Sequence, residues 1–394
     1  MEDQVKGIPP CLHENFVIQS GSMRILIIRP GALGDTLMLA PALAEMKGRG
    51  DITLVARRPG LDILRPFVRE GMDYERGGWY RLFMDDPLLI SNRMSENSTK
   101  PSPSRDCVAS PFMVRQAHHE RTMTQQKSIT KPLVLSADPL GPTSKGDERR
   151  MTTQSPMGEG QGEGGTIDLV VAFLSDQGEK VTDNLKVLMP RSSIHVFPPF
   201  PQKEENVHAA FYLAKCMESS GCAVNPGKAI AEATQRPLME GEPFLVPGSE
   251  RRIVFHPGSG GTAKNHPREF WAALLRDFRG IVSNKAPLAV LLGPAEESCL
   301  PFYREQFSGD ETEIIFSPEM EPLLRLLKSA PLYLGHDSGI THLAAMLGTP
   351  TIALFRKSNL QQWKPLGPRV EVIEEESSPD LIRETCERAR EIML

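Results

Sequence analysis

Short apolar runs that alternate with helical patterns recur through the second half of this chain. The apolar runs lie within 251–261, 287–293, 331–339 and 350–355, and the helical patterns between them at 267–278, 321–330 and 340–348. Strands that alternate with helices in this way predict a parallel sheet with helices on both faces. This alternation restricts the second half of the chain to an α/β fold.

The first half of the chain begins with the same arrangement. An apolar run from Arg24 to Ile28 is followed by a turn from Gly31 to Gly34, a helical pattern from Thr36 to Met46 and a second apolar run at 51–58. This βαβ order predicts parallel strands joined by a crossover helix. Pro41 lies inside the helical pattern, where it lacks an N–H group to donate, so we expect a kink or a restricted first turn there.

The composition changes abruptly after residue 91. From Asn92 to about Gly165 the only aromatic residue is Phe112, and small, polar and charged residues dominate. Such a stretch buries too little apolar surface to offset its ordering entropy, so we expect a mostly disordered insertion. His118 and His119 lie within it, but no further ligands stand at useful spacing, and we predict no metal site.

Structure is expected to resume after the insertion. Strands are predicted at 166–176 and 192–200, and a helix at 205–221 that ends at Gly221. Residues 223–250 are rich in proline and glycine, so we expect them to contain the interdomain linker. At the end of the chain, Ser378 and Pro379 predict the start of a terminal helix.

Charge and cysteine usage exclude some classes of function. The net charge of −5 and the isoelectric point near 6.1 argue against a nucleic acid as the main partner. No run of 18 apolar residues occurs, so no transmembrane helix is expected. The six cysteines are scattered and form no CxxC motif, which indicates reduced thiols and a cytoplasmic setting.

Two loops in the second half have the residues of an anion site. In "HPGSGGTAKNHP" (256–267), glycines allow close approach of backbone N–H groups, and Ser259 and Lys264 offer a hydroxyl and a cation. In "GHDSGITH" (335–342), a helix begins near Ile340, and its free N–H groups favour an anion. A flexible surface loop and an ordinary helix start remain open as alternatives.

Acidic and histidine side chains near these loops have two interpretations each. Asp337 can accept hydrogen bonds from sugar hydroxyls or cap the helix. His342 can donate to a phosphate or be a buried structural histidine. Glu296 follows another strand, where a carboxylate can hold the ribose hydroxyls of a nucleotide or be a solvated first-turn residue.

The first half places a carboxylate, Asp35, beside Gly31 and Gly34 at a helix start. If the second half holds the phosphates, Asp35 is free to face a second substrate as a general base. A plain helix cap fits the spacing equally well. The GxxGD spacing lacks the third glycine of a dinucleotide fingerprint, and no acidic residue ends the second strand, so a Rossmann dehydrogenase is the weakest alternative.

Several of these segments together resemble glycosyltransferase family 9, the ADP-heptose:lipopolysaccharide heptosyltransferases and their relatives. The matching segments, in the order in which the family has them, are "ILIIRPGALGDTLMLAPAL", "IDLVVAF", "FHPGSGGTAKNHPREFWAAL", "LYLGHDSGITHLAAMLGTPTIALF" and "WKPLGP". Three features depart from the family pattern. His266 stands where an aromatic residue is usual, Arg356 where glycine is usual, and the insertion is foreign to the family.

The resemblance implies the GT-B architecture, in which two Rossmann-like domains with parallel sheets face a central cleft. The implied domains are an N-terminal extension (1–22), an acceptor domain (23–245) interrupted by the insertion (92–166), a nucleotide-sugar domain (246–375), and a terminal helix (376–394) that packs back across the junction.

The resemblance also implies an activity, the inverting and metal-independent transfer of a sugar, with heptose from ADP-heptose expected, to a lipopolysaccharide core-type acceptor. Asp35 is the implied base on the acceptor-side loop of Gly31 and Gly34. The implied donor-binding residues are Ser259, Lys264, Glu296, Asp337, Ser338, Gly339, Ile340, Thr341 and His342.

No cofactor is expected besides the donor, which is a substrate. A lipid-linked saccharide is the expected acceptor, which places the protein in the cytoplasm with peripheral contact at the membrane surface. A non-catalytic GT-B binding module and a sugar-nucleotide epimerase of the same architecture stay open as alternatives.

Overall fold

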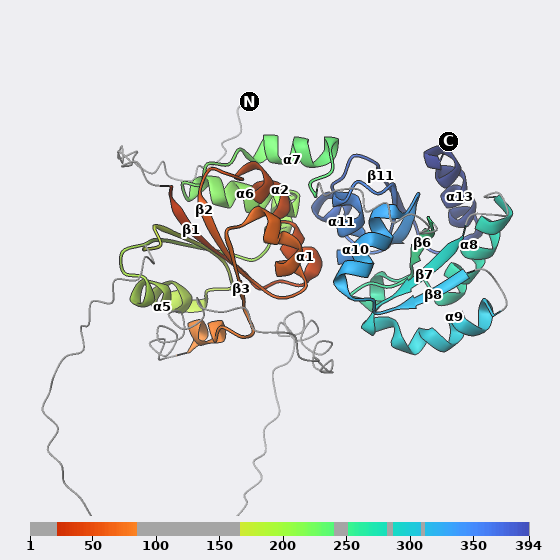
Figure 1. The fold of residues 1–394 in the computed structure, drawn as a ribbon, viewed down its shortest axis with the longest axis horizontal. Coiled ribbons are helices and arrows are strands. Elements are labelled where there is room, and N and C mark those ends of the chain that lie inside the picture. The colour runs from red at the N-terminus through yellow and green to blue at the C-terminus, as the bar shows by residue number, and fades with distance from the viewer. Residues whose placement is uncertain (1–21, 85–165, 240–250, 282–286, 309–311, 394) are drawn as a thin grey trace, which may run out of the picture. The chain divides into compact units, whose positions relative to one another are not determined.

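The computed structural model describes residues 22–84, 166–239, 251–281, 287–308 and 312–393 (Figure 1). The strands in these ranges form two sheets, and every pair of neighbouring strands is parallel. The predicted α/β fold with parallel sheets is confirmed. Except for residues 22 and 166, the expected N-terminal extension and the expected insertion lie outside the described residues.

The first sheet has the strand order β3-β2-β1-β4-β5. Its strands are β1 (Arg24–Arg29), β2 (Asp51–Ala56), β3 (Glu70–Asp73), β4 (Leu169–Phe173) and β5 (Ser193–Phe197). The central strand β1 is apolar on both faces because helices cover both. Ile25 and Ile27 join the core with α1, α2 and α6, whereas Leu26 and Ile28 pack with α5.

Short helices connect these strands. They are α1 (Leu33–Leu37), α2 (Ala40–Glu45), α3 (Gly60–Leu64), α5 (Lys180–Leu188), α6 (Ala209–Ser219) and α7 (Pro226–Gln235), with 3₁₀ turns η1 (Arg65–Phe67), η2 (Trp79–Phe83), η5 (Gln177–Glu179) and η6 (Lys203–Glu205). The helical pattern at 36–46 is broken as Pro41 predicts. α1 ends at Leu37 and α2 starts at Ala40, with Pro41 in its first turn, where a missing N–H costs no helical bond.

The second sheet has the strand order β11-β10-β9-β6-β7-β8. Its strands are β6 (Ile253–His256), β7 (Leu288–Leu292), β8 (Thr312–Phe316), β9 (Tyr333–His336), β10 (Thr351–Phe355) and β11 (Val370–Glu374). Its helices are α8 (Arg268–Ile281), α9 (Leu300–Gln306), α10 (Met320–Ser329), α11 (Gly339–Met346), α12 (Leu360–Trp363) and α13 (Pro379–Met393), with η7 (Thr262–Lys264) and η8 (Pro294–Cys299). α8 and α13 share one core with this sheet, and α10 and α11 cover its other face.

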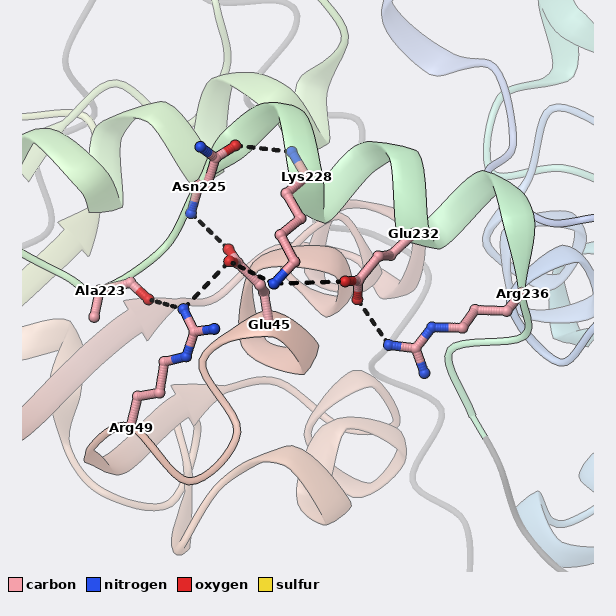
Figure 2. Close-up of polar contacts among 7 residues, drawn as sticks. All are labelled: Glu45, Arg49, Ala223, Asn225, Lys228, Glu232 and Arg236. Atoms are coloured by element: carbon pink, nitrogen blue, oxygen red, sulfur yellow. Dashed lines mark hydrogen bonds and ion pairs between the residues drawn. The ribbon is translucent and has the colours of Figure 1, made fainter.

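Helix α7 lies inside 223–250, the segment expected to contain the interdomain linker, and the sequence analysis predicted no helix there. Asn225 caps the helix by accepting a hydrogen bond from the N–H of Lys228 (2.8 Å). Figure 2 shows the buried carboxylate of Glu45, on α2, beside Lys228 Nζ (3.7 Å) and Arg49 (3.3 Å) and accepting from Asn225 N–H (2.5 Å). Because a buried charge is stable only when it is paired, this cluster fixes α7 to α2.

The terminal helix starts as predicted, with Ser378 Oγ accepting from the N–H of Leu381 (3.0 Å). The expectation that it packs back across the junction stays a prediction. The side chains of Leu381, Cys386 and Ala389 are buried in the core of the second sheet, and the helix packs against α8. These residues form one apolar stripe at helical spacing, and α8 presents the matching apolar face.

Candidate functional site

The loop after β6 carries two of the predicted donor-binding residues, Ser259 and Lys264. The side chain of Ser259 is buried, and its hydroxyl lies 2.5 Å from Oδ1 of Asn265, to which it donates. It also lies 3.1 Å from the carbonyl oxygen of Gly261. The hydrogen bond between Ser259 and Asn265 therefore closes the loop by joining its two ends.

Lys264 is held against a buried carboxylate on the neighbouring strand end. Its Nζ donates to Oδ2 of Asp337 (2.5 Å), whose side chain is 5% exposed. Nε2 of His342 lies 3.7 Å from the other oxygen, Oδ1. Burial alone would raise the pKa of Asp337, but His342 and the charge of Lys264 outweigh it and lower the pKa below its ordinary value. Asp337 is thus a permanent anion next to a cation, as the adjacency of β6 and β9 allows.

Helix α11 begins directly after Asp337. Ser338 caps it, with Oγ accepting from the N–H of Thr341 (3.3 Å), and the hydroxyl of Thr341 donates to the carbonyl of His336. Gly339 and Ile340 are the first residues of the helix, so their N–H groups have no partner within it. Together with Lys264, these N–H groups are donors at the strand ends that can bind an anion.

A fully buried histidine, His336, supports this region, and the sequence analysis predicted no role for it. Its Nε2 accepts hydrogen bonds from the N–H of His266 (2.8 Å) and from Nε1 of Trp271 (3.3 Å). Burial lowers the pKa of His336 well below its ordinary value, so the ring stays neutral and can accept both bonds. His266, one of the departures from the family pattern, also has a structural role, because its ring stacks on that of Phe270 (ring centroids 4.6 Å apart).

Glu296 lies against the same loop. Its carboxylate accepts from the N–H of Gly293 (2.9 Å), and a Cβ added to Gly258 would lie 2.1 Å from its Cδ, so a larger residue at position 258 would displace the carboxylate. The side chain is buried, and this burial raises its pKa. It is therefore not a solvated surface residue, and it brings an acidic group next to the proposed phosphate loop.

Asp35 caps its own helix in the first sheet. Its Oδ2 accepts from the N–H of Ala32 (3.2 Å), and a Cβ added to Gly31 would lie 2.6 Å from the Cβ of Asp35. The backbone carbonyl of Asp35 accepts from Nε of Arg29 (3.4 Å), whose side chain is buried. The cap uses one carboxylate oxygen and leaves the half-buried side chain partly accessible.

The starts of α1 and α11 are in contact. A Cβ added to Gly34 would lie 3.4 Å from the Cα of Gly339 and 3.5 Å from the His342 ring, and one added to Gly339 would lie 2.8 Å from the N of Gly34. This close approach requires glycine at position 339, whereas a Cβ at position 34 would make ordinary van der Waals contacts. The predicted acceptor-side loop therefore adjoins the predicted donor-binding residues, although they are some 300 residues apart in sequence.

Within the described ranges, no group of three or more histidine, cysteine, aspartate or glutamate side chains is arranged to hold a metal ion. The described helices also include none that is long and apolar enough to cross a membrane.

Comparisons with known proteins identify relatives of this chain. A family model described as glycosyltransferase family 9 (heptosyltransferase) matches residues 203–389. Lipopolysaccharide heptosyltransferase 1 of Campylobacter coli is 29% identical over 119 residues. That alignment covers 29% of this chain and about a third (34%) of the relative's length.

Solved structures match over nearly the whole chain. ADP-heptose lipopolysaccharide heptosyltransferase II of E. coli gives a TM-score of 0.57 at 14% identity, covering 94% of this chain and 98% of that chain. The E. coli heptosyltransferase WaaC with ADP gives 0.55 at 14% identity, covering 93% and 100%. At this level of identity the matches establish the fold, which is the GT-B architecture of two parallel-sheet domains.

Proposed function

We propose that the chain, whose residues 203–389 match the model of glycosyltransferase family 9, is a glycosyltransferase of lipopolysaccharide biosynthesis. It transfers heptose from ADP-heptose to a core-type saccharide, with inversion and without a metal ion. The observation that carries this proposal is the cluster of Lys264, Asp337 and the start of α11 beside the Ser259 loop.

The second sheet holds the donor. Lys264 and the N–H groups of Gly339 and Ile340 bind the diphosphate, and Ser259 adds a hydroxyl. Glu296 lies beside the loop and binds the ribose hydroxyls. Asp337 stays ionised because His342 and Lys264 lie against its carboxylate. It accepts hydrogen bonds from the donor sugar. Ser338, Thr341 and His342 complete this group by shaping the helix start.

Charge development explains why Lys264 and α11 suffice. In the reaction, the acceptor oxygen forms a bond to the anomeric carbon while the bond from that carbon to the diphosphate oxygen breaks. The electron pair leaves with the diphosphate, which gains negative charge. A fixed cation and a helix N-terminus stabilise that charge most in the transition state, which lowers the barrier without a metal ion.

Asp35 receives the proton of the acceptor hydroxyl. Its second carboxylate oxygen is not used by the helix cap, and Gly34, its neighbour in sequence, contacts Gly339 at the donor-side helix. A single displacement from the opposite face inverts the anomeric centre. No cofactor takes part besides the donor substrate. The acceptor is a lipid-linked saccharide, so the reaction takes place in the cytoplasm at the membrane surface.

A donor screen tests the proposal. Purified full-length chain is incubated with a lipid A–sugar acceptor and, in separate reactions, ADP-heptose, ADP-glucose, UDP-glucose and UDP-N-acetylglucosamine, each with and without EDTA. We expect acceptor-dependent release of ADP from ADP-heptose that EDTA does not reduce.

Each other result rejects a defined part of the proposal. Release from a different donor rejects heptose, and loss of release with EDTA rejects metal independence. Binding of a sugar nucleotide without release from any of them favours a non-catalytic binding module, and conversion of UDP-N-acetylglucosamine without acceptor favours an epimerase.

A further inference from the structure

Arg356 stands immediately after β10, at the carboxyl end of the second sheet. Its side chain is 23% exposed. Nε donates to Oε2 of Glu376 (2.5 Å), and an Nη donates to the backbone carbonyl of Asn265 (2.9 Å). One guanidinium therefore joins the segment after β11 to the loop after β6.

Asn265 transmits this contact to the interior of the loop. Its backbone accepts from Arg356, and its side-chain Oδ1 accepts from the hydroxyl of Ser259 (2.5 Å). Asn265 also lies next to Lys264 in sequence, and the following residue, His266, is fixed by a bond between its Nδ1 and Ser377 Oγ (2.7 Å). The end of the loop is thus tied to residues 356 and 376–377.

We infer that Arg356 is a positioning residue for the diphosphate of the nucleotide sugar, acting through Asn265 on Ser259 and Lys264. This inference rests on the proposed function, because the diphosphate is the ligand of that same loop. Arg356 holds the carbonyl of Asn265 in place, which fixes the direction of the serine hydroxyl and the path of the lysine.

The shape of the guanidinium explains why arginine is needed for this role. It presents several N–H donors in one rigid plane, so it can bond a carboxylate and a carbonyl at once. A lysine ammonium at this position reaches one of the two partners well but lacks the fixed fork. Glycine leaves the Asn265 carbonyl without this donor.

A matched ion pair exists at the opposite end of the sheet. Arg252, just before β6, pairs through Nε with Glu313 Oε2 (2.7 Å), and the side chains of Arg252 and Glu313 are 27% and 50% exposed. Arg356 and Glu376 are 23% and 63% exposed. Substitution of Arg252 therefore removes a partly exposed arginine–carboxylate pair, as substitution of Arg356 does. Arg252 lies at the start of β6, at the opposite end of the strand from the loop.

The first measurement is ADP affinity by calorimetry on the full chain, for Arg356→Met, Arg356→Lys and Arg252→Met, with folding checked by thermal melting. We expect about a tenfold loss of ADP affinity for Arg356→Met, because the charge-assisted hydrogen bond that holds the Asn265 carbonyl, and through it the loop, is lost. Arg356→Lys should recover part of that loss, and Arg252→Met should bind ADP as the wild type does.

A double-mutant cycle with Ser259→Ala supplies a readout that a general structural role would not move. If Arg356 acts through Ser259, Arg356→Met should cost clearly less in the Ser259→Ala background than alone. Full additivity, an unchanged affinity for Arg356→Met, or an equal loss for Arg252→Met overturns the inference. If the wild-type chain binds no nucleoside diphosphate (ADP, UDP and GDP tested), the proposed function fails, and the inference fails with it.

Discussion

The starts of α1 and α11 have the same position in the two sheets but opposite electrostatics. Each follows a central parallel strand, β1 or β9, and each has a glycine where the two helices meet. In α1 the carboxylate of Asp35 accepts a hydrogen bond from the N–H of Ala32, the N-cap residue. In α11 the cap is the neutral Ser338, and the carboxylate of Asp337 turns instead to Lys264 and His342.

Under the proposed function, this difference lets one structural element serve two substrates. A carboxylate that fills the helix start repels a phosphate, so the start of α1 suits a hydroxyl that must lose a proton. A neutral cap and a nearby cation leave the start of α11 attractive to an anion. The two aspartates also differ in position, since Asp35 lies in the first turn of α1, whereas Asp337 precedes Ser338, the cap of α11.

The largest expected effect comes from Asp35→Asn. Asparagine keeps an oxygen that can accept from Ala32 N–H, so the helix cap and the fold should survive, but the base is lost. We expect turnover to fall by about 10²–10⁴-fold, the range of general base catalysis, with donor affinity nearly unchanged. Steady-state kinetics and ADP calorimetry measure the two quantities separately.

Asp62→Asn is the matched control, since Asp62 lies in the first turn of the neighbouring helix α3 and pairs with Arg58 (3.5 Å). It should keep full activity. If Asp35→Asn instead loses donor binding with little change in the turnover of bound donor, the contrast between the two helix starts is wrong.

The next effect tests the cation at α11. Lys264→Met should lower donor affinity by about 10- to 100-fold, because one charge-assisted contact with the diphosphate disappears. Lys228→Met is the control, since Lys228 also faces a buried carboxylate, that of Glu45, but on the first sheet. Both variants should lose some thermal stability, and only Lys264→Met should lose ADP binding by calorimetry. Equal binding losses would show that pairing with a buried acid, rather than phosphate contact, explains the effect.

Acidification should destabilise the start of α11 before it destabilises the start of α1. Burial lowers the pKa of His256 to about 4 and, together with the charge of Arg356, that of His266 to about 4 as well, from 6.5. Between pH 6.5 and 4 the unfolded state binds more protons than the folded state, so the free energy of unfolding rises with pH and falls on acidification. The slope is at most about 1.4 kcal/mol per pH unit for each histidine.

Hydrogen exchange at pH 7, 6 and 5, with denaturant unfolding at each pH, measures this effect. His256 Nδ1 lies 3.1 Å from the hydroxyl of Tyr333 and 3.4 Å from that of Ser338, so the amides of β9 and α11 should lose protection first. His256→Gln should reduce the slope of unfolding free energy against pH. Simultaneous loss of protection in α1 and α11 would contradict the expected order.

Local sequence rules predicted most strands, the break at Pro41 and the gathering of candidate residues at strand ends, because parallel strands bring their carboxyl ends to one edge. They missed α7, although Asn225 followed by a proline in the first turn is a helix start signal. The link from His336 to the loop joins residues 70 positions apart, and such a contact depends on the sheet order. No pattern in the sequence contains that information.

The smallest effects are expected from substitutions at the two N-cap residues, Ala32 of α1 and Ser338 of α11. Ser338→Ala removes the acceptor for the N–H of Thr341 and should cost about 1 kcal/mol of unfolding free energy. Ala32→Ser places a capping hydroxyl at the N-cap of α1, where no side chain of the N-cap residue bonds the helix. Because Asp35 accepts from the N–H of Ala32, whereas a serine hydroxyl at the N-cap accepts from the N–H of Asp35, the two bonds complement each other and the new hydroxyl should add about 1 kcal/mol. Urea unfolding of both variants measures the two changes. No gain for Ala32→Ser would contradict the capping arrangement at the start of α1.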